Sequence, residues 1–156
     1  MQTQYLCVHC HYYQPPRGNP FSDGPLVEPD AAPFQNWNAR ITSECYQPNA
    51  DLGNFEYVSY NIGETLLQWL YSYAPETYQK IIAADEANAN KRNIGNGVAQ
   101  TMHHTILPLS RREDKVTQLV WGQRAFEHRF GRPSSGIWLP EMAVDYETLE
   151  VLLENG

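Results

Sequence analysis

The sequence has little of what marks membrane, nucleic-acid-binding or disulfide-stabilised proteins. No window approaches the roughly 20 apolar residues of a membrane span, and the N-terminus lacks the features of a secretory signal peptide. The 11 basic residues are scattered and outnumbered by 18 acidic ones, so no basic stripe can neutralise a phosphate backbone. The three cysteines, an odd number, favour reduced thiols. We therefore expect a cytoplasmic protein that binds neither membranes nor nucleic acid.

The sequence does contain enough apolar material for one core. Of its 156 residues, 42% are hydrophobic and 12% aromatic, which suits one domain and is too little for two ordinary ones. Residues 4–11 form a short apolar run that ends before Pro15 and Pro16, as expected for a buried strand. A stretch rich in Pro, Gly, Asn and Asp follows over residues 14–56. A connection this long is usually functional or contains small local elements, and its aromatic residues indicate that it packs against the rest of the domain.

Helical spacing and capping residues predict four helices. They are expected over 62–73, capped by Asn61; from Pro75 to Arg92; over 112–130, ended by Gly131; and after Asp145, which caps a last helix that buries Leu149, Leu152 and Leu153.

Two further short strands are predicted, in GNGVAQTMHHTILPL (95–109) and GIWLPE (136–141). Strands that alternate with helices indicate right-handed crossovers and a parallel sheet. Three strands cannot close a barrel, because even a small barrel needs about eight. We therefore expect an α/β fold, the N-terminal part of an incomplete parallel barrel, with residues 1–156 as a single partial domain.

Polar side chains follow each predicted strand, where parallel β/α folds place their reactive groups. His9 and His11 follow the first strand, His103 and His104 the second, and Glu141 the third. His9 and His11 are two residues apart, so a strand directs both to one face. The pair suits binding of substrate hydroxyls or of a metal, and equally a purely structural role. Only one of the two adjacent histidines can face the site, and we prefer His104.

Glu141 comes three residues after Trp138. An indole can stack on the apolar face of a pyranose, and a carboxylate can attack or stabilise an oxocarbenium-like centre. An ordinary Glu would also be favoured near the start of the last helix, but the neighbouring Trp138 favours the sugar interpretation. Asp145 is interpreted as the cap of that helix and not as a catalytic acid.

Four strings in this order, HCHYYQPPR, NIGETLLQWL, GNGVAQTMHHTILPL and GIWLPE, resemble the N-terminal catalytic region of glycoside hydrolase family 57, in particular a subgroup with a downstream domain of unknown function. The resemblance covers essentially the whole chain. It implies an incomplete (β/α)7 barrel that acts on α-linked glucans or related carbohydrates, retains anomeric configuration and uses no metal or other cofactor. By position, Glu141 matches the nucleophile, and the substrate-binding residues are His9, His11, His104 and Trp138.

Two features depart from the family pattern. Better-known members have Gln directly after the second histidine, whereas Tyr12 and Tyr13 precede Gln14 here; they also tend to have Glu early in the second motif, where this sequence has Val98-Ala99-Gln100. The family's general acid is an Asp on a later strand, which the resemblance places beyond Gly156. We therefore expect the first portion of a retaining glycoside hydrolase or transglycosylase, inactive alone and completed by the rest of the barrel from a downstream sequence.

Two other interpretations fit the residues. His9 and His11, with His104, could bind a metal that activates water in a carbohydrate deacetylase. Trp138 could instead belong to a non-catalytic carbohydrate-binding module. In each case the partner is a carbohydrate.

Overall fold

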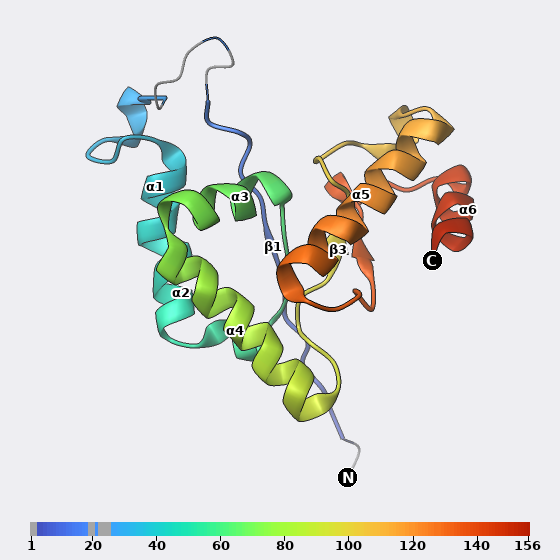
Figure 1. Cartoon of the computed structure of the whole chain (residues 1–156), viewed down its shortest axis with the longest axis horizontal. Coiled ribbons are helices and arrows are strands. Elements are labelled where there is room, and N and C mark those ends of the chain that lie inside the picture. The colour runs from blue at the N-terminus through green and yellow to red at the C-terminus, as the bar shows by residue number, and fades with distance from the viewer. Residues whose placement is uncertain (1–2, 19–20, 22–25) are drawn as a thin grey trace.

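The computed structural model describes residues 3–18, 21 and 26–156. Its fold is α/β, with short parallel strands beside packed helices (Figure 1). The strands are β1 (His9–Tyr12), β2 (Ser59–Ile62), β3 (Ala99–Gln100) and β4 (Ile137–Trp138). β1 pairs with β2 and β3 with β4, both in parallel, and a parallel bridge between Tyr60 and Gly97 connects the two pairs. The predicted parallel arrangement is therefore confirmed.

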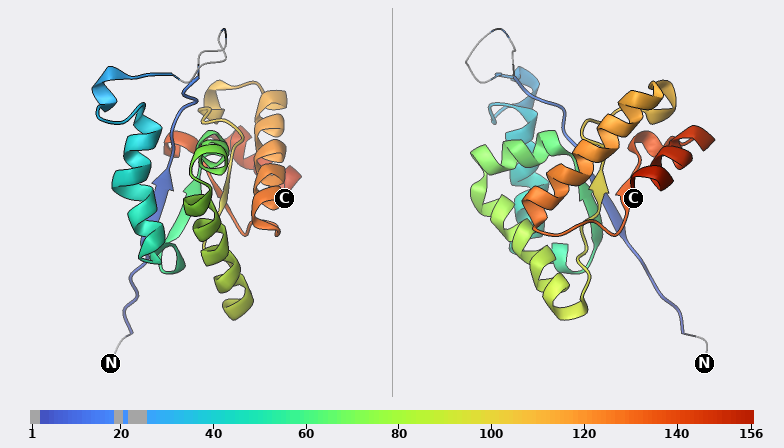
Figure 2. Two further views of the ribbon diagram at one scale, coloured as in Figure 1. Left: turned by 60° about the vertical axis from the view of Figure 1, so that its left-hand side comes forward. Right: turned by 45° about the vertical axis from the view of Figure 1, so that its right-hand side comes forward.

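Helices flank these strands on both sides. In Figure 2, β1 and β2 run through the middle, with the α1–α2 segment and α5 on opposite sides. The α-helices are α1 (Trp37–Ile41), α2 (Gln47–Asp51), α3 (Glu64–Tyr73), α4 (Pro75–Arg92), α5 (Arg112–Phe130) and α6 (Tyr146–Asn155). A π-helical turn, Thr42–Tyr46, joins α1 to α2, and single 3₁₀ turns lie at Pro29–Ala31, Asn54–Glu56, Leu107–Leu109 and Pro140–Met142. No helix in the described part of the chain has the length and apolarity needed to cross a membrane.

Two predicted helices are confirmed with their bounds. α4 begins at Pro75 and ends at Arg92, and α5 covers 112–130 before Gly131, whose φ of 67° lies in the left-handed region. Glycine suits that conformation because it has no Cβ to collide with the following carbonyl. The long connection packs in part as expected, since Tyr46 is 5% exposed and Phe34 and Trp37 are half-buried, whereas Phe21 is 95% exposed.

The first strand is shorter than predicted. Only the end of the apolar run pairs, from His9 onward, while Tyr5 and Leu6 are each 91% exposed. The reason is that β2 begins at Ser59, opposite His9, so the residues before Val8 have no neighbouring strand on this side. An apolar run needs a partner strand to become part of a sheet.

The predicted cap at Asn61 is wrong. Asn61 lies within β2, completely buried, and α3 begins two residues later than predicted, at Glu64, with Gly63 as its N-cap. An N-cap side chain must reach an amide of the first helical turn. The Asn61 amide instead contacts side chains from β1 and β3.

The last helix is also oriented differently from the prediction. Asp145 does cap α6, because its Oδ1 accepts a hydrogen bond from the Thr148 amide at 2.8 Å. Leu149 and Leu153 are 44% and 86% exposed, however, and Val151 is fully buried. α6 packs against α5 through the face that carries Thr148 and Val151, with Leu152 at its edge, so the prediction holds for Leu152 and is wrong for Leu149 and Leu153.

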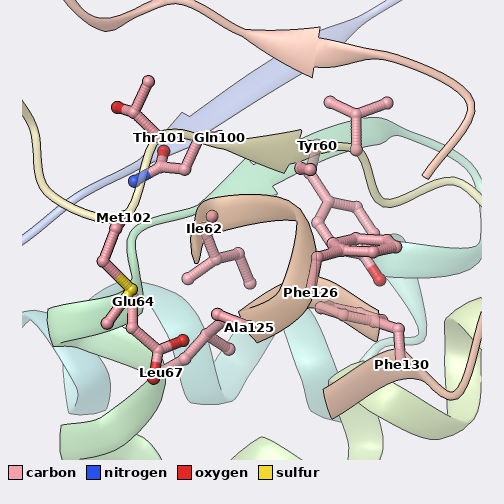
Figure 3. Close-up of a pocket in the computed structure, with 13 residues that line it drawn as sticks. Tyr60, Ile62, Glu64, Leu67, Gln100, Thr101, Met102, Ala125, Phe126 and Phe130 are labelled. Carbon is pink, nitrogen blue, oxygen red and sulfur yellow. The ribbon is translucent and has the colours of Figure 1, made fainter. Parts of the chain in front are cut away.

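The core lies between the strands and their helices. Tyr60 and Ile62 of β2 face Ala125, Phe126 and Phe130 of α5 across a small gap (Figure 3). α5 lies very close to β3 at Gly122, where a Cβ atom would be 2.0 Å from the carbonyl oxygen of Gln100. This close approach fixes where β3, and the loop that follows it, can lie.

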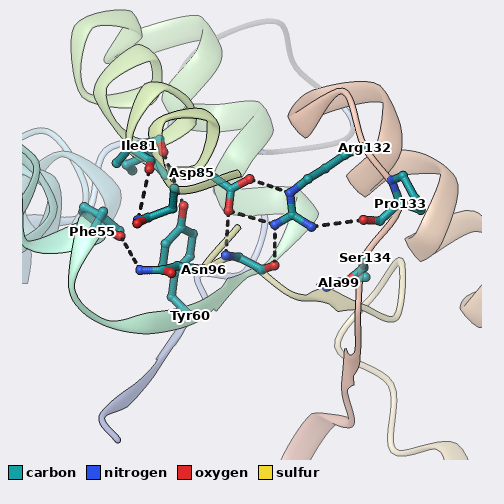
Figure 4. Close-up of polar contacts among 12 residues, drawn as sticks. Phe55, Tyr60, Ile81, Asp85, Asn96, Ala99, Arg132, Pro133 and Ser134 are labelled. Carbon is teal, nitrogen blue, oxygen red and sulfur yellow. Dashed lines mark hydrogen bonds and ion pairs between the residues drawn. The ribbon is translucent and has the colours of Figure 1, made fainter. Parts of the chain in front are cut away.

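A buried ion pair joins the segments that lead into the strands. Arg132 donates from Nε and Nη2 to the two carboxylate oxygens of Asp85, each at 2.8 Å (Figure 4). Asp85 Oδ1 also accepts from the Gly97 amide at 2.8 Å, and Arg132 Nη2 donates to the Gly97 carbonyl at 2.9 Å. These contacts connect α4, the segment before β3 and the segment before β4, which leaves the opposite ends of the strands free to carry a site.

Candidate active site

The structure brings together the predicted site residues from three strands. His9 and His11 lie in β1, His104 follows β3, and Trp138 ends β4. Glu141 lies in the turn just beyond β4, and its Oε1 is 2.8 Å from His104 Nε2. Groups separated by up to 132 positions in the sequence thus converge at one end of the sheet, as parallel strands require.

Five rings form a continuous stack. Tyr13 stacks on His104 with centroids 4.0 Å apart, and His104 stacks on His11 at 5.2 Å. Trp138 stacks on His11 at 5.0 Å and on His9 at 4.9 Å. Aromatic rings at these separations attract each other. The stack therefore holds the imidazoles in fixed planes.

Trp138 lies against both imidazoles of β1. Both His9 and His11 also lie within hydrogen-bond distance of Asn61 Oδ1. Trp138 itself is partly buried.

Glu141 has an unusual backbone. Its φ and ψ are 56° and 16°, and Met142 has a φ of 53°, so two consecutive residues with side chains lie in the left-handed region. Such a conformation costs about 1–3 kcal/mol and is frequent at active sites. The Glu141 side chain is 60% exposed while its partner His104 is 9% exposed. The turn therefore directs a carboxylate outward and anchors one of its oxygens on a buried imidazole.

His103 does not take part in this arrangement. Its side chain is exposed and stacks on none of the rings of the described residues, and its amide donates to Gln118 Oε1 at 2.8 Å. The structure thus places His104, and not its neighbour, within the site.

Polar residues that the sequence analysis missed lie beneath the histidines. In the β1–β2 register, His9 is opposite Ser59 and His11 is opposite Asn61. Ser59 Oγ is 2.8 Å from His9 Nδ1, and Asn61 contacts both imidazoles and the side chain of Gln100. The available signal was the alternation of Ser59 and Asn61, which matches that of the two histidines.

The environment of His11 disfavours its charged form. Burial lowers the pKa of the His11 imidazole, and repulsion from His104 and His9 acts in the same direction. Glu141 opposes this effect, as would an Asn61 oxygen bonded to the ring. Two polar atoms of the site, His104 Nδ1 and Trp138 Nε1, are buried without a hydrogen-bond partner among the described residues.

The histidines and Glu141 are also of the residue types that bind metal ions. Within residues 3–18, 21 and 26–156, no three His, Cys, Asp or Glu side chains are grouped so that they could hold a metal ion. Both ring nitrogens of His9 and Nδ1 of His11 instead contact Ser59 and Asn61.

The chain matches a known protein family over nearly its whole length. Residues 8–156, nearly the whole sequence, match the model of glycosyl hydrolase family 57. A search of curated proteins gave no match. The matched region includes every residue of the ring stack and Glu141. The chain therefore belongs to glycosyl hydrolase family 57, a family of enzymes that hydrolyse or transfer α-linked glucans.

Proposed function

We propose that this protein is a retaining glycoside hydrolase or transglycosylase that acts on α-linked glucan or a related carbohydrate, with Glu141 as its nucleophile. One observation supports this most directly: Glu141, exposed and in a left-handed turn, is held by His104 beside the stacked rings of His11 and Trp138. A carboxylate beside an indole and several imidazoles suits a sugar, which presents both C–H faces and hydroxyl groups.

We assign substrate binding to His9, His11, His104 and Trp138. The indole offers an apolar surface for a pyranose ring, while the imidazoles can exchange hydrogen bonds with hydroxyl groups. The stack presents these rings already oriented, so little side-chain freedom is lost when a sugar binds.

The chemistry needs a second carboxyl group. In a retaining enzyme a carboxylate oxygen bonds to C1, and an acid about 5–5.5 Å away protonates the leaving oxygen. Among the described residues, Glu141 is the only carboxylate in contact with the stacked rings. We assign the acid to a carboxyl group beyond Gly156, in the remainder of a (β/α)7 barrel, and expect residues 1–156 alone not to hydrolyse glucan.

A trapping experiment with 5-fluoro-α-D-glucosyl fluoride tests the role of Glu141. A Glu141 oxygen would bond to C1 while the C1–F bond breaks and fluoride departs with the electron pair, so no acid is required. In the native protein, mass spectrometry should find one fluoroglucosyl group on the peptide that contains Glu141. The Glu141→Gln variant should remain unlabelled. A label elsewhere, or none in the native protein, would overturn the proposal.

A further inference from the structure

Asn61 makes an unusual set of contacts for a buried amide. It is 0% exposed. Its Oδ1 lies 3.1 Å from His9 Nε2, and its Nδ2 lies 2.9 Å from His11 Nδ1 and 2.5 Å from Gln100 Oε1. One side chain from β2 thus connects both histidines of β1 to β3.

Because Asn61 Nδ2 is the nearer atom, these contacts favour one position for the proton of His11. Asn61 Nδ2 has two hydrogens, one directed at Gln100 Oε1 and the other at His11 Nδ1. His11 Nδ1 must then accept, so the ring proton sits on Nε2. Asn61 Oδ1 is also near His11 Nδ1, but at 3.2 Å it is farther away than Nδ2.

The same logic assigns His9. Asn61 Oδ1 can only accept, so His9 Nε2 carries a hydrogen and donates it. His9 Nδ1 then accepts from the Ser59 hydroxyl at 2.8 Å. Each of these contacts pairs a donor with an acceptor when both imidazoles are neutral and protonated on Nε2.

We propose that Asn61 and Gln100 are positioning residues that hold His9 and His11 as neutral imidazoles protonated on Nε2. This inference deepens, and for its ligand rests on, the proposed function. His11 Nε2 has no protein partner among the described residues, so its N–H is left to donate to a ligand oxygen without bringing a positive charge. The site is then suited to an uncharged glucan and not to a sugar phosphate.

The groups around His11 explain why such control is needed. His9 lies on the same strand, His104 after β3 and Glu141 after β4. Of these, Glu141 favours a proton on His11, and an imidazolium beside it would form an ion pair that weakens the carboxylate as a nucleophile. A proton on His11 Nδ1 would point at the amino hydrogens of Asn61, which opposes this charging.

Long-range ¹H–¹⁵N correlation spectra of the ¹⁵N-labelled protein at neutral pH test the assignment directly. We expect both imidazoles to show a protonated Nε2 and an unprotonated Nδ1. A His11 ring that is protonated on Nδ1, or charged, would overturn the proposal, and this result does not depend on whether any variant folds.

Two variants test whether Asn61 sets the tautomer of His11 or only supports the fold. Asn61→Asp keeps the shape but replaces the amino group with an acceptor, so His11 should become protonated on Nδ1 with its pKa raised by about 1–3 pH units. Ser59→Ala is the matched control, because it removes a partner of His9 alone and should leave the His11 signals in place. If Asn61→Asp leaves the His11 tautomer unchanged, Asn61 does not determine it.

Two sugars distinguish this inference from the proposed function. Maltotriose should shift the His11 Nε2–H signal, and glucose 1-phosphate should not at the same concentration. A stronger response to the phosphate would overturn the preference for a neutral ligand. A response to neither sugar, with both tautomers as assigned, would count against the proposed function and leave the role of Asn61 intact.

Discussion

His104 Nε2 lies 2.8 Å from Glu141 Oε1, although 37 positions separate the two residues. The contact connects the loop after β3 to the turn after β4. His104 is almost fully buried and Glu141 is largely open to solvent, so one carboxylate oxygen is fixed while the other remains accessible. The relationship gives Glu141 a defined orientation despite its exposed position.

Replacement of Glu141 by Gln should abolish turnover and preserve the fold. The amide can still bond to His104, but it cannot attack C1, so kcat of the complete enzyme, with the remainder of the barrel, should fall by about 10³-fold or more on a maltooligosaccharide. The control is Glu113→Gln, an exposed position in the first turn of α5 with no side-chain partner among the described residues, which should leave kcat unchanged. Full turnover in the Glu141 variant would indicate a binding module instead.

Gly122→Ala should destabilise the protein severely. The added Cβ would lie 2.0 Å from the Gln100 carbonyl oxygen and 2.9 Å from the Met102 amide nitrogen, both backbone atoms that cannot rotate away. We expect a loss of about 3 kcal/mol or more in the free energy of unfolding, measured by urea denaturation.

Gly136→Ala provides the matched control for this change. Its added Cβ would meet only Val98 Cγ1, at 3.9 Å, so its stability should stay close to that of the unmodified protein. Equal stability of the two variants would mean that α5 does not press on β3 as described.

The elements predicted best are those specified by local sequence. α5 has helical spacing over its whole length and a glycine at its end, and α4 begins at a proline that suits a first helical turn. The convergence of the strand ends followed from the alternation of helices and strands. This convergence depends on the parallel topology of the strands, and the regular alternation of helices and strands is enough to predict that topology.

The β2 strand and its role were missed because their signals are not local. Asn61 precedes a clear helix at a spacing typical of a cap, and nothing nearby indicates that the residue pairs with a strand 50 positions earlier. The exposed leucines of α6 have a similar cause. Both faces of that helix carry apolar residues, and only the position of α5 decides that Val151 is buried.

Asp85→Asn should lower the free energy of unfolding, although the two side chains have nearly the same shape. Asn can still accept from the Gly97 amide, but the Arg132 guanidinium loses its countercharge while its side chain is only 17% exposed. Breaking a buried pair in this way costs about 3–5 kcal/mol, and the partial exposure of Arg132 places the expected loss near 3 kcal/mol in urea denaturation.

The exposed ion pair between Lys80 and Asp51 is the control for this prediction. Both of its side chains are about half exposed, so Lys80→Gln should cause no measurable change in stability. A similar small effect of Asp85→Asn would show that the contacts of Arg132 with Gly97 and Pro133 suffice to hold the three segments together.

The cap of α6 should make stability depend on pH. Hydrogen bonds from Thr148 lower the pKa of the Asp145 carboxyl, and Lys115 Nζ, 3.2 Å from Oδ2, acts in the same direction. Because the folded pKa lies below the ordinary value near 3.9, the carboxylate stabilises the protein fully above about pH 4. This contribution is lost as the pH falls through the folded pKa.

Asp145→Asn isolates that charge, since Asn is itself a good cap and α6 should still begin at Tyr146. The variant should be less stable than the unmodified protein at pH 7, and this difference should shrink as the pH falls and Asp145 becomes protonated. Asp114→Asn, at an exposed position of α5 without a side-chain partner among the described residues, should show a much smaller difference at pH 7. A difference for Asp145→Asn that stays constant from pH 7 to pH 2, measured by urea denaturation, would mean that cap geometry, and not the carboxylate charge, stabilises the start of α6.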